Sequence, residues 1–96
     1  MNQYLIIAQD GTDENALDRR MAVRPSHLEK ARELKSNDNF IIGGAILNTN
    51  EQMAGSVMIV QFESDDALNA WLSTEPYING KVWEKYEVKR IKLANI

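Results

Sequence analysis

Three segments of this chain are apolar at most positions, and this feature constrains the fold more than any other. They are QYLIIAQ at residues 3–9, NFIIGGAIL at 39–47 and GSVMIVQF at 55–62. Each has the length and the β-branched content of a strand. A strand that borders water on one side alternates apolar with polar residues. Because these segments are apolar on both alternating sets of positions, we expect both faces of their sheet to be covered.

A helical pattern follows the first of these segments. Residues 16–36 place apolar side chains on one face of a helix. Pro25 disfavours helical backbone in the residue before it. Ser26 and Glu29 have the spacing of a capping box, which starts a helix. We therefore expect an interruption around Val23, with the capping box restarting or tightening the helix at Ser26.

The remainder of the chain supplies a second helix and a fourth strand. Residues 64–74, SDDALNAWLST, begin with Ser64, a good N-cap, and have two aspartates in the first turn. Residues 77–80, YING, predict a turn. The segment 81–93, KVWEKYEVKRIKL, predicts a last strand. The apolar pattern changes between Val88 and Ile91, which predicts either a bulge or a change of surroundings near Lys89.

The elements therefore follow the order β-α-β-β-α-β, with an antiparallel hairpin between the second and third strands. This order predicts an α+β fold of the ferredoxin-like type, in which both helices lie on one face of a four-stranded antiparallel sheet. Residues 1–96 form a single domain. The two helices cover only one face. A second copy, packed sheet to sheet about a two-fold axis, is the simplest cover for the other, so we expect an obligate homodimer.

The composition excludes several classes of function. The chain has no cysteine, which rules out disulfides, thiol catalysis and cysteine metal ligands. Its formal net charge of −3 argues against nucleic acid as a partner. The apolar runs are too short to cross a bilayer, so no membrane association is expected. Met1 leads directly into a strand without the basic start of a signal peptide, which favours the cytoplasm.

Neither a metal ion nor a cofactor is expected. With one histidine, carboxylates would have to supply nearly all metal ligands, and neither D-x-D nor H-E-x-x-H spacing occurs. No glycine-rich loop suits a phosphate, and the G-x-G-x-x-G and G-x-S-x-G motifs are absent.

The single histidine, His27, is the main candidate for chemistry. In the expected fold the start of the first helix and the end of the second lie at the same end of the sheet, which brings His27 toward Glu75. Histidine exchanges protons near neutral pH. A carboxylate on one ring nitrogen fixes the tautomer and stabilises the imidazolium. The alternative is structural: a half-exposed histidine bonded to backbone, and a solvated acid before a proline.

Other residues near that end are candidates for substrate binding. Arg20 and Arg24 could hold an anion, because guanidinium groups match carboxylates and phosphates, or they could form a solvated helix face. Asp10 ends the first strand at the same end of the sheet. Gly44 could leave bare backbone beside a ligand, or it could mark a bulge. Tyr77 could line a pocket or belong to the core.

Several short pieces stand in a recognisable order: AQD at residues 8–10, R-x-x-x-R-P-x-H-L at 20–28, a glycine-containing second strand, FES at 62–64, AW at 70–71 and EPY at 75–77. In this order and spacing, and over nearly its whole length, the chain resembles the YciI-like proteins. These are small bacterial domains of the dimeric α+β barrel type.

The resemblance implies a homodimeric enzyme with an active-site pair: a histidine at the position of His27, and an aspartate where this chain has Glu75, which is one methylene longer. Related barrels move protons on aromatic ring compounds or lactones without a metal. We therefore expect a cofactor-independent lyase or isomerase acting on a small cyclic or anionic metabolite, with His27 as general acid or base. A non-catalytic module that binds a small molecule, or a structural subunit, are the alternatives.

Overall fold

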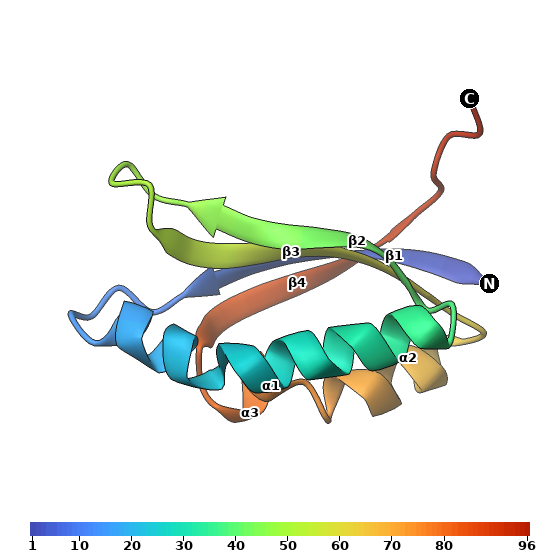
Figure 1. The fold of residues 1–96 in the computed structure, drawn as a ribbon. Coiled ribbons are helices and arrows are strands. Elements are labelled where there is room, and N and C mark those ends of the chain that lie inside the picture. The colour runs from blue at the N-terminus through green and yellow to red at the C-terminus, as the bar shows by residue number, and fades with distance from the viewer.

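The computed structural model describes residues 1–96, which one antiparallel sheet organises (Figure 1). Along the chain the elements are β1 (Asn2–Asp10), α1 (Ala16–Ser36), β2 (Phe40–Leu47), β3 (Met53–Phe62), α2 (Asp65–Leu72), α3 (Pro76–Asn79) and β4 (Trp83–Ile91). The strands lie in the order β2-β3-β1-β4. The fold is therefore the predicted ferredoxin-like α+β arrangement, and β2 and β3 form the predicted hairpin.

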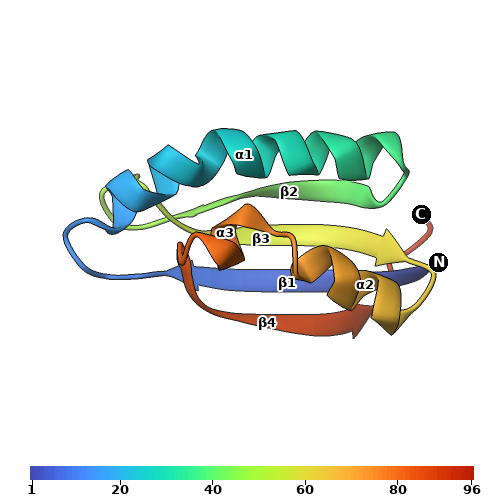
Figure 2. The ribbon, with the colours of Figure 1, turned by 90° about the horizontal axis from the view of Figure 1, so that it is seen from below.

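All three helices pack on one face of the sheet, as Figure 2 shows from the helix side. Alternate residues of the two central strands point to this face and meet the inward residues of the helices. The core that results includes Tyr4, Ile6, Ala8, Leu34, Met58, Val60, Phe62, Leu68 and Trp71. Burying one large aliphatic side chain contributes about 1.5–3 kcal/mol, so the period-2 pattern decides which face the helices cover.

The predicted interruption of the first helix is wrong. α1 is continuous from Ala16 to Ser36 and contains Pro25 in its interior. Proline removes the hydrogen bond to the carbonyl four residues earlier, here that of Met21. Both Pro25 and Met21 lie on the exposed side of the helix, where water can satisfy that carbonyl. Ser26 and Glu29 therefore lie within the helix and do not start one.

The region from Ser64 to Asn79 contains a cap that was predicted and a short helix that was not. Ser64 caps α2 as predicted, with its hydroxyl oxygen accepting a hydrogen bond from the backbone N–H of Ala67 at 3.1 Å. The segment expected to be a turn forms the short helix α3 instead. Pro76 stands at its first position, where proline is well tolerated, and Glu75 caps it.

Of the two alternatives predicted near Lys89, a bulge or a change of surroundings, the bulge is wrong. β4 pairs with β1 in unbroken register at that point, and the register shifts between Gln9 and Asp10 instead. The change in the pattern of apolar residues along β4 has another cause. Val88 packs against the core, whereas Ile91, three residues later, lies on the opposite face of the sheet.

The second face of the sheet carries no helix (Figure 1). Its central region is apolar and consists of Leu5, Ile7, Ile42, Ile46, Val57 and Ile59, which the strand register places on the same side. Ile42 is 61% exposed there. We call this region the open face. The structure thus shows the predicted apolar residues on both faces, with one face uncovered in the single chain.

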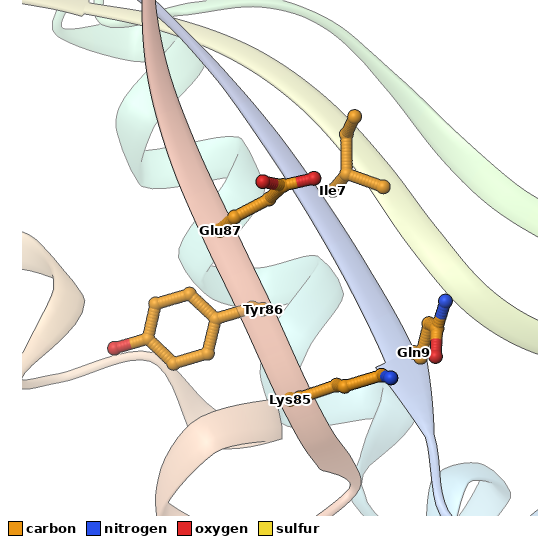
Figure 3. Close-up of a pocket in the computed structure, with 5 residues that line it drawn as sticks. All are labelled: Ile7, Gln9, Lys85, Tyr86 and Glu87. Atoms are coloured by element: carbon orange, nitrogen blue, oxygen red, sulfur yellow. The ribbon is translucent and has the colours of Figure 1, made fainter.

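A shallow hollow of about 320 Å³ lies along β1 and β4 (Figure 3). Figure 3 shows Ile7, Gln9, Lys85 and Glu87 on one side of these strands, with Tyr86 pointing to the other side. The hollow is therefore continuous with the open face, on the opposite side of the sheet from the helices. None of the helices is long and apolar enough to cross a membrane.

Candidate active site

His27 and Glu75 are in direct contact, although 48 residues separate them in the sequence. The His27 Nδ1 lies 2.5 Å from a carboxylate oxygen, Oε1, of Glu75. The side chain of His27 is 12% exposed, and that of Glu75 is 1% exposed. His27 comes from the middle of α1, and Glu75 from the turn between α2 and α3. The topology thus brings together the two residues that the sequence analysis paired.

The local structure around Glu75 explains its orientation. Glu75 is the N-cap of α3, and its Oε1 also accepts a hydrogen bond from the backbone N–H of Tyr77 at 3.2 Å. Two N–H donors therefore meet at one carboxylate oxygen. A buried carboxylate needs such donors to offset its lost hydration. The hydrogen bond that caps α3 thus fixes the Glu75 carboxylate in a position where it contacts the imidazole.

Tyr77 forms one wall beside His27. The two rings are stacked, with centroids 3.9 Å apart and planes 15° from parallel. Tyr77 is 1% exposed, and burial raises the pKa of its phenol, while Arg20 and Arg24 act in the opposite direction. The phenol therefore stays protonated over the physiological pH range. Its hydroxyl has no hydrogen-bond partner within the chain.

Arg20 and Asp10 form a buried ion pair behind the site. Nη1 of Arg20 donates to both carboxylate oxygens of Asp10 at 3.1 Å. Its Nη2 donates to the hydroxyl oxygen of Ser56 at 3.0 Å, and Nε1 of Trp83 donates to the same oxygen at 3.1 Å. The sequence analysis gave both residues as candidates for substrate binding. In the structure both are buried, and Arg20 contacts Ser56 and the Tyr77 ring, which line the cavity.

Ser56 was not singled out in the sequence, yet its surroundings give it a defined role. Two N–H donors occupy the two lone pairs of its hydroxyl oxygen. The hydroxyl hydrogen must therefore be donated elsewhere, and Ser56 lines the cavity that also contacts His27. The sequence signal was a serine at an inward position of a strand whose other inward residues are apolar.

A cavity of about 170 Å³ lies between α1 and the β2–β3 hairpin, next to His27. Its walls are mostly apolar, and the polar groups are few. The lining residues are Arg24, His27, Leu28, Ala31, Phe40, Gly43, Gly44, Ala45, Met53, Ser56, Met58 and Tyr77. Three of the predicted substrate-binding residues, Arg24, Gly44 and Tyr77, are among them.

Arg24 and the glycines differ in what they contribute to this cavity. Arg24 is half-buried and has no ion-pair or hydrogen-bond partner within the chain, so its charge is available to an anion. A side chain at Gly44 would meet no atom within 4 Å. At Gly43 it would approach the Phe40 ring to 3.0 Å and the Val57 carbonyl to 3.2 Å. The close packing that favours glycine is therefore at Gly43.

The geometry suits proton exchange at one atom. An ionised carboxylate can only accept a hydrogen bond, so its contact with Nδ1 favours the neutral tautomer that carries the hydrogen there and leaves the Nε2 lone pair free. Nε2 has no hydrogen-bond partner within the chain, and His27 lines the cavity. When Nε2 takes up a proton, Glu75 stabilises the imidazolium.

Comparisons of the sequence give a consistent result. The family model for the YCII-related domain matches residues 2–92. Protein YciI of Escherichia coli O6:H1 is 35% identical over 95 residues, which are 93% of this chain and 95% of that protein. A Haemophilus influenzae protein is also 35% identical over 95 residues, with the same coverage of both chains.

Solved structures share the fold. TftG, the 5-chloro-2-hydroxyhydroquinone dehydrochlorinase from Burkholderia phenoliruptrix AC1100 in complex with 2,5-dihydroxybenzoquinone, superposes with a TM-score of 0.83. It is 24% identical and covers 96% of this chain and 95% of its own. A dimeric ferredoxin-like protein from Jannaschia sp. CCS1 has a TM-score of 0.61 at 15% identity and covers 97% of this chain and 100% of its own. The family match and the 35% identity confirm the resemblance found in the sequence: the chain belongs to the YCII-related family.

Proposed function

We propose that this chain is a cofactor-independent enzyme that moves a proton on a small cyclic or anionic molecule, in a reaction of the lyase or isomerase type. His27 is the general acid or base, and Glu75 orients it. The observation that carries this proposal is the contact of 2.5 Å between Nδ1 and a buried carboxylate, on a histidine that lines a cavity. This arrangement is that of a histidine held in one tautomer for proton transfer.

The proposed step needs only side chains of the chain itself. Nε2 of His27 takes a proton from a carbon or hydroxyl of the bound molecule, and the electron pair left behind forms a double bond or an oxyanion. In an isomerisation the imidazolium returns the proton to a different atom. In an elimination the same electron pair expels a leaving group such as halide, and the imidazolium then releases its proton to water. Glu75 stabilises the imidazolium between the two events.

Two groups of the cavity favour a substrate that carries or develops negative charge. The guanidinium of Arg24 is unpaired, and the Ser56 hydroxyl has a hydrogen to donate. Donors placed where charge develops stabilise a transition state more than a neutral ground state. The remaining walls are apolar. A dry, apolar cavity of about 150 Å³ can hold one benzene molecule, so the size of this cavity fits a single six-membered ring.

The relatives guide the choice of compounds. TftG is named a dehydrochlorinase, and its structure contains a dihydroxybenzoquinone. A hydroxylated ring with a leaving group fits the volume of the present cavity and carries the negative charge that Arg24 could bind. We therefore propose this class of compound as the substrate of the chain.

We also propose that the working form is a homodimer. The open face is apolar at its centre and lacks a helix. Two structures with this fold, from Jannaschia and from an uncultured marine organism, are described as dimeric ferredoxin-like proteins. A partner copy seated on the open face would bury the residues that the helices leave uncovered.

The experiment uses two probes, 2,5-dihydroxybenzoquinone for binding and 5-chloro-2-hydroxyhydroquinone for chloride release. Binding is measured by calorimetry with the wild-type protein, His27→Gln, Arg24→Gln and, as a matched control, Arg32→Gln at an exposed position of α1. We expect His27→Gln to bind but to release no chloride, and Arg24→Gln to bind more weakly, with Arg32→Gln unchanged. Release of chloride by His27→Gln at the wild-type rate would refute the role of His27. Binding without turnover in the wild type would favour the binding module.

A further inference from the structure

Arg20, Tyr77 and His27 form a column of three planar groups. The Arg20 guanidinium carbon lies 4.6 Å from the centroid of the Tyr77 ring, and the His27 ring centroid lies 3.9 Å from it. Arg20 and His27 are seven residues apart on α1, so they stand two helical turns, roughly 10 Å, apart. The stacked His27 ring covers one face of the Tyr77 ring, so the Arg20 guanidinium contacts the other face and the Tyr77 ring lies between the two groups.

The bond to Glu75 alone does not fix the plane of the imidazole fully. A hydrogen bond tolerates some variation in length and angle, so coupled changes in χ1 and χ2 of His27 can keep the bond at Nδ1 while they tilt the ring and shift Nε2. A second contact on the face of the ring restricts this tilt. The near-parallel stack with Tyr77, at 15°, is such a contact.

We propose that Tyr77 is a positioning residue: held between Arg20 and His27, its ring fixes the plane of the imidazole so that Nε2 faces the cavity. This inference rests on the proposed function, because only a proton-transfer histidine needs a fixed plane. It adds a residue that acts through His27 and does not itself take up the proton.

The surroundings of Tyr77 make it a suitable support. Its backbone N–H donates to the same Glu75 oxygen that contacts His27, which connects the backbone of Tyr77 to the carboxylate. Arg20 is itself fixed by Asp10 and Ser56. The electron-rich face of a phenol also attracts a cation. The stack therefore becomes more favourable when His27 is protonated, which is the state formed during the proposed step.

His27 is the only histidine in the chain, so nuclear magnetic resonance can test the stack without a substrate. Its ring protons give one set of signals, and a stacked aromatic ring moves such signals upfield. We expect the folded wild type to show upfield signals relative to the protein in urea. Tyr77→Phe is expected to keep this displacement, and Tyr77→Leu to lose most of it. Tyr86→Leu, a control at a tyrosine that is 43% exposed, is expected to keep it.

Wild-type signals at the positions of the unfolded chain would overturn the proposal, as would unchanged signals in a folded Tyr77→Leu. Backbone amide spectra report whether each variant is folded. If Tyr77→Leu does not fold, Tyr77→Trp replaces it. The larger ring is expected to move the His27 signals further upfield, and signals that do not move would again overturn the proposal.

A turnover measurement then connects the stack to catalysis. On 5-chloro-2-hydroxyhydroquinone we expect Tyr77→Leu to lower kcat by about 10- to 100-fold, because small displacements of a catalytic group have effects of this size. Tyr77→Phe, which keeps the ring, is expected to lose less. Equal losses in the two variants would overturn the positioning role. A stack that is present while His27→Gln still turns over would instead refute the proposed function alone.

Discussion

At the scale of single residues, Glu75 has two connected roles. It caps α3 through the N–H of Tyr77 and orients His27 through the same oxygen. Relatives with this active-site pair are expected to carry the shorter aspartate here. In this chain the longer side chain still reaches the imidazole at 2.5 Å. The extra methylene has therefore not broken the pair.

Replacing Glu75 with glutamine tests the charge of this pair while keeping its shape. The amide oxygen can still accept from both N–H donors, but the imidazolium loses its countercharge. We expect turnover to fall by about 10²–10⁴-fold, the usual contribution of a tuned acid–base group. Chloride release on the probe compound measures this, and near-ultraviolet circular dichroism reports the fold. If Glu75→Gln released chloride at the wild-type rate, the negative charge of Glu75 would not contribute to turnover.

Tyr77 should affect stability in alkaline solution. Burial raises the pKa of its phenol above the unfolded value near 10.0. Below that pH the neutral phenol is favoured in both states. Above it the unfolded chain ionises first, so stability is lost as the pH rises through the folded pKa. Urea unfolding at pH 8 and pH 10.5 should therefore show a smaller alkaline loss for Tyr77→Phe than for the wild type. The exposed control Tyr86→Phe should behave as the wild type does.

Sequence reasoning placed some of these side chains and could not place others. His27 and Glu75 were paired because strand order alone determines which helix ends meet. The role of Arg20 could not be predicted, because the sequence pattern around an arginine on a helix is the same whether its side chain contacts water or a buried aspartate. Ser56 was missed because its role depends on two donors from distant elements, Arg20 and Trp83. Such contacts require the folded chain.

At the scale of elements, residue patterns and capping residues predicted a strand or helix correctly where tertiary packing favoured the same structure. The strands and the cap of α2 were predicted from alternation and from one serine. The interruption predicted around Val23 does not occur, because packing of α1 on the sheet outweighs the one hydrogen bond that Pro25 removes on its exposed side. The four residues of α3 were too few to give a period.

Pro25→Ala tests this explanation. Alanine restores a donor for the Met21 carbonyl and suits the helix interior, while the unfolded chain gains some freedom. We expect the free energy of unfolding to rise by about 1–2 kcal/mol, measured with urea. Ser26→Ala, at the next exposed position, should change it by less than about 0.5 kcal/mol. A clear loss of stability in Pro25→Ala would mean that the proline supports a local bend that the helix needs.

At the scale of the whole molecule, the sheet presents more apolar surface than its own helices cover. A chain of 96 residues has little core to spare, so leaving Leu5, Ile7, Val57 and Ile59 beside water would cost stability. If a second copy covers them, folding and association are linked, and the thermal midpoint rises with protein concentration. This uncovered face could be predicted from the sequence. Alternate residues of a strand point to opposite faces of the sheet, and both sets are apolar in these strands.

Ile59→Lys places a charge at the centre of the open face. In the proposed dimer each copy would place such a charge in an apolar interface, where an unpaired charge is strongly unfavourable. Light scattering with size-exclusion chromatography should therefore show a dimer for the wild type and a monomer for Ile59→Lys. Met21→Lys, an equal change at an exposed apolar residue of α1, should remain dimeric. A wild type that is monomeric at micromolar concentration, or an Ile59→Lys that stays dimeric, would mean that the open face is not where two copies meet.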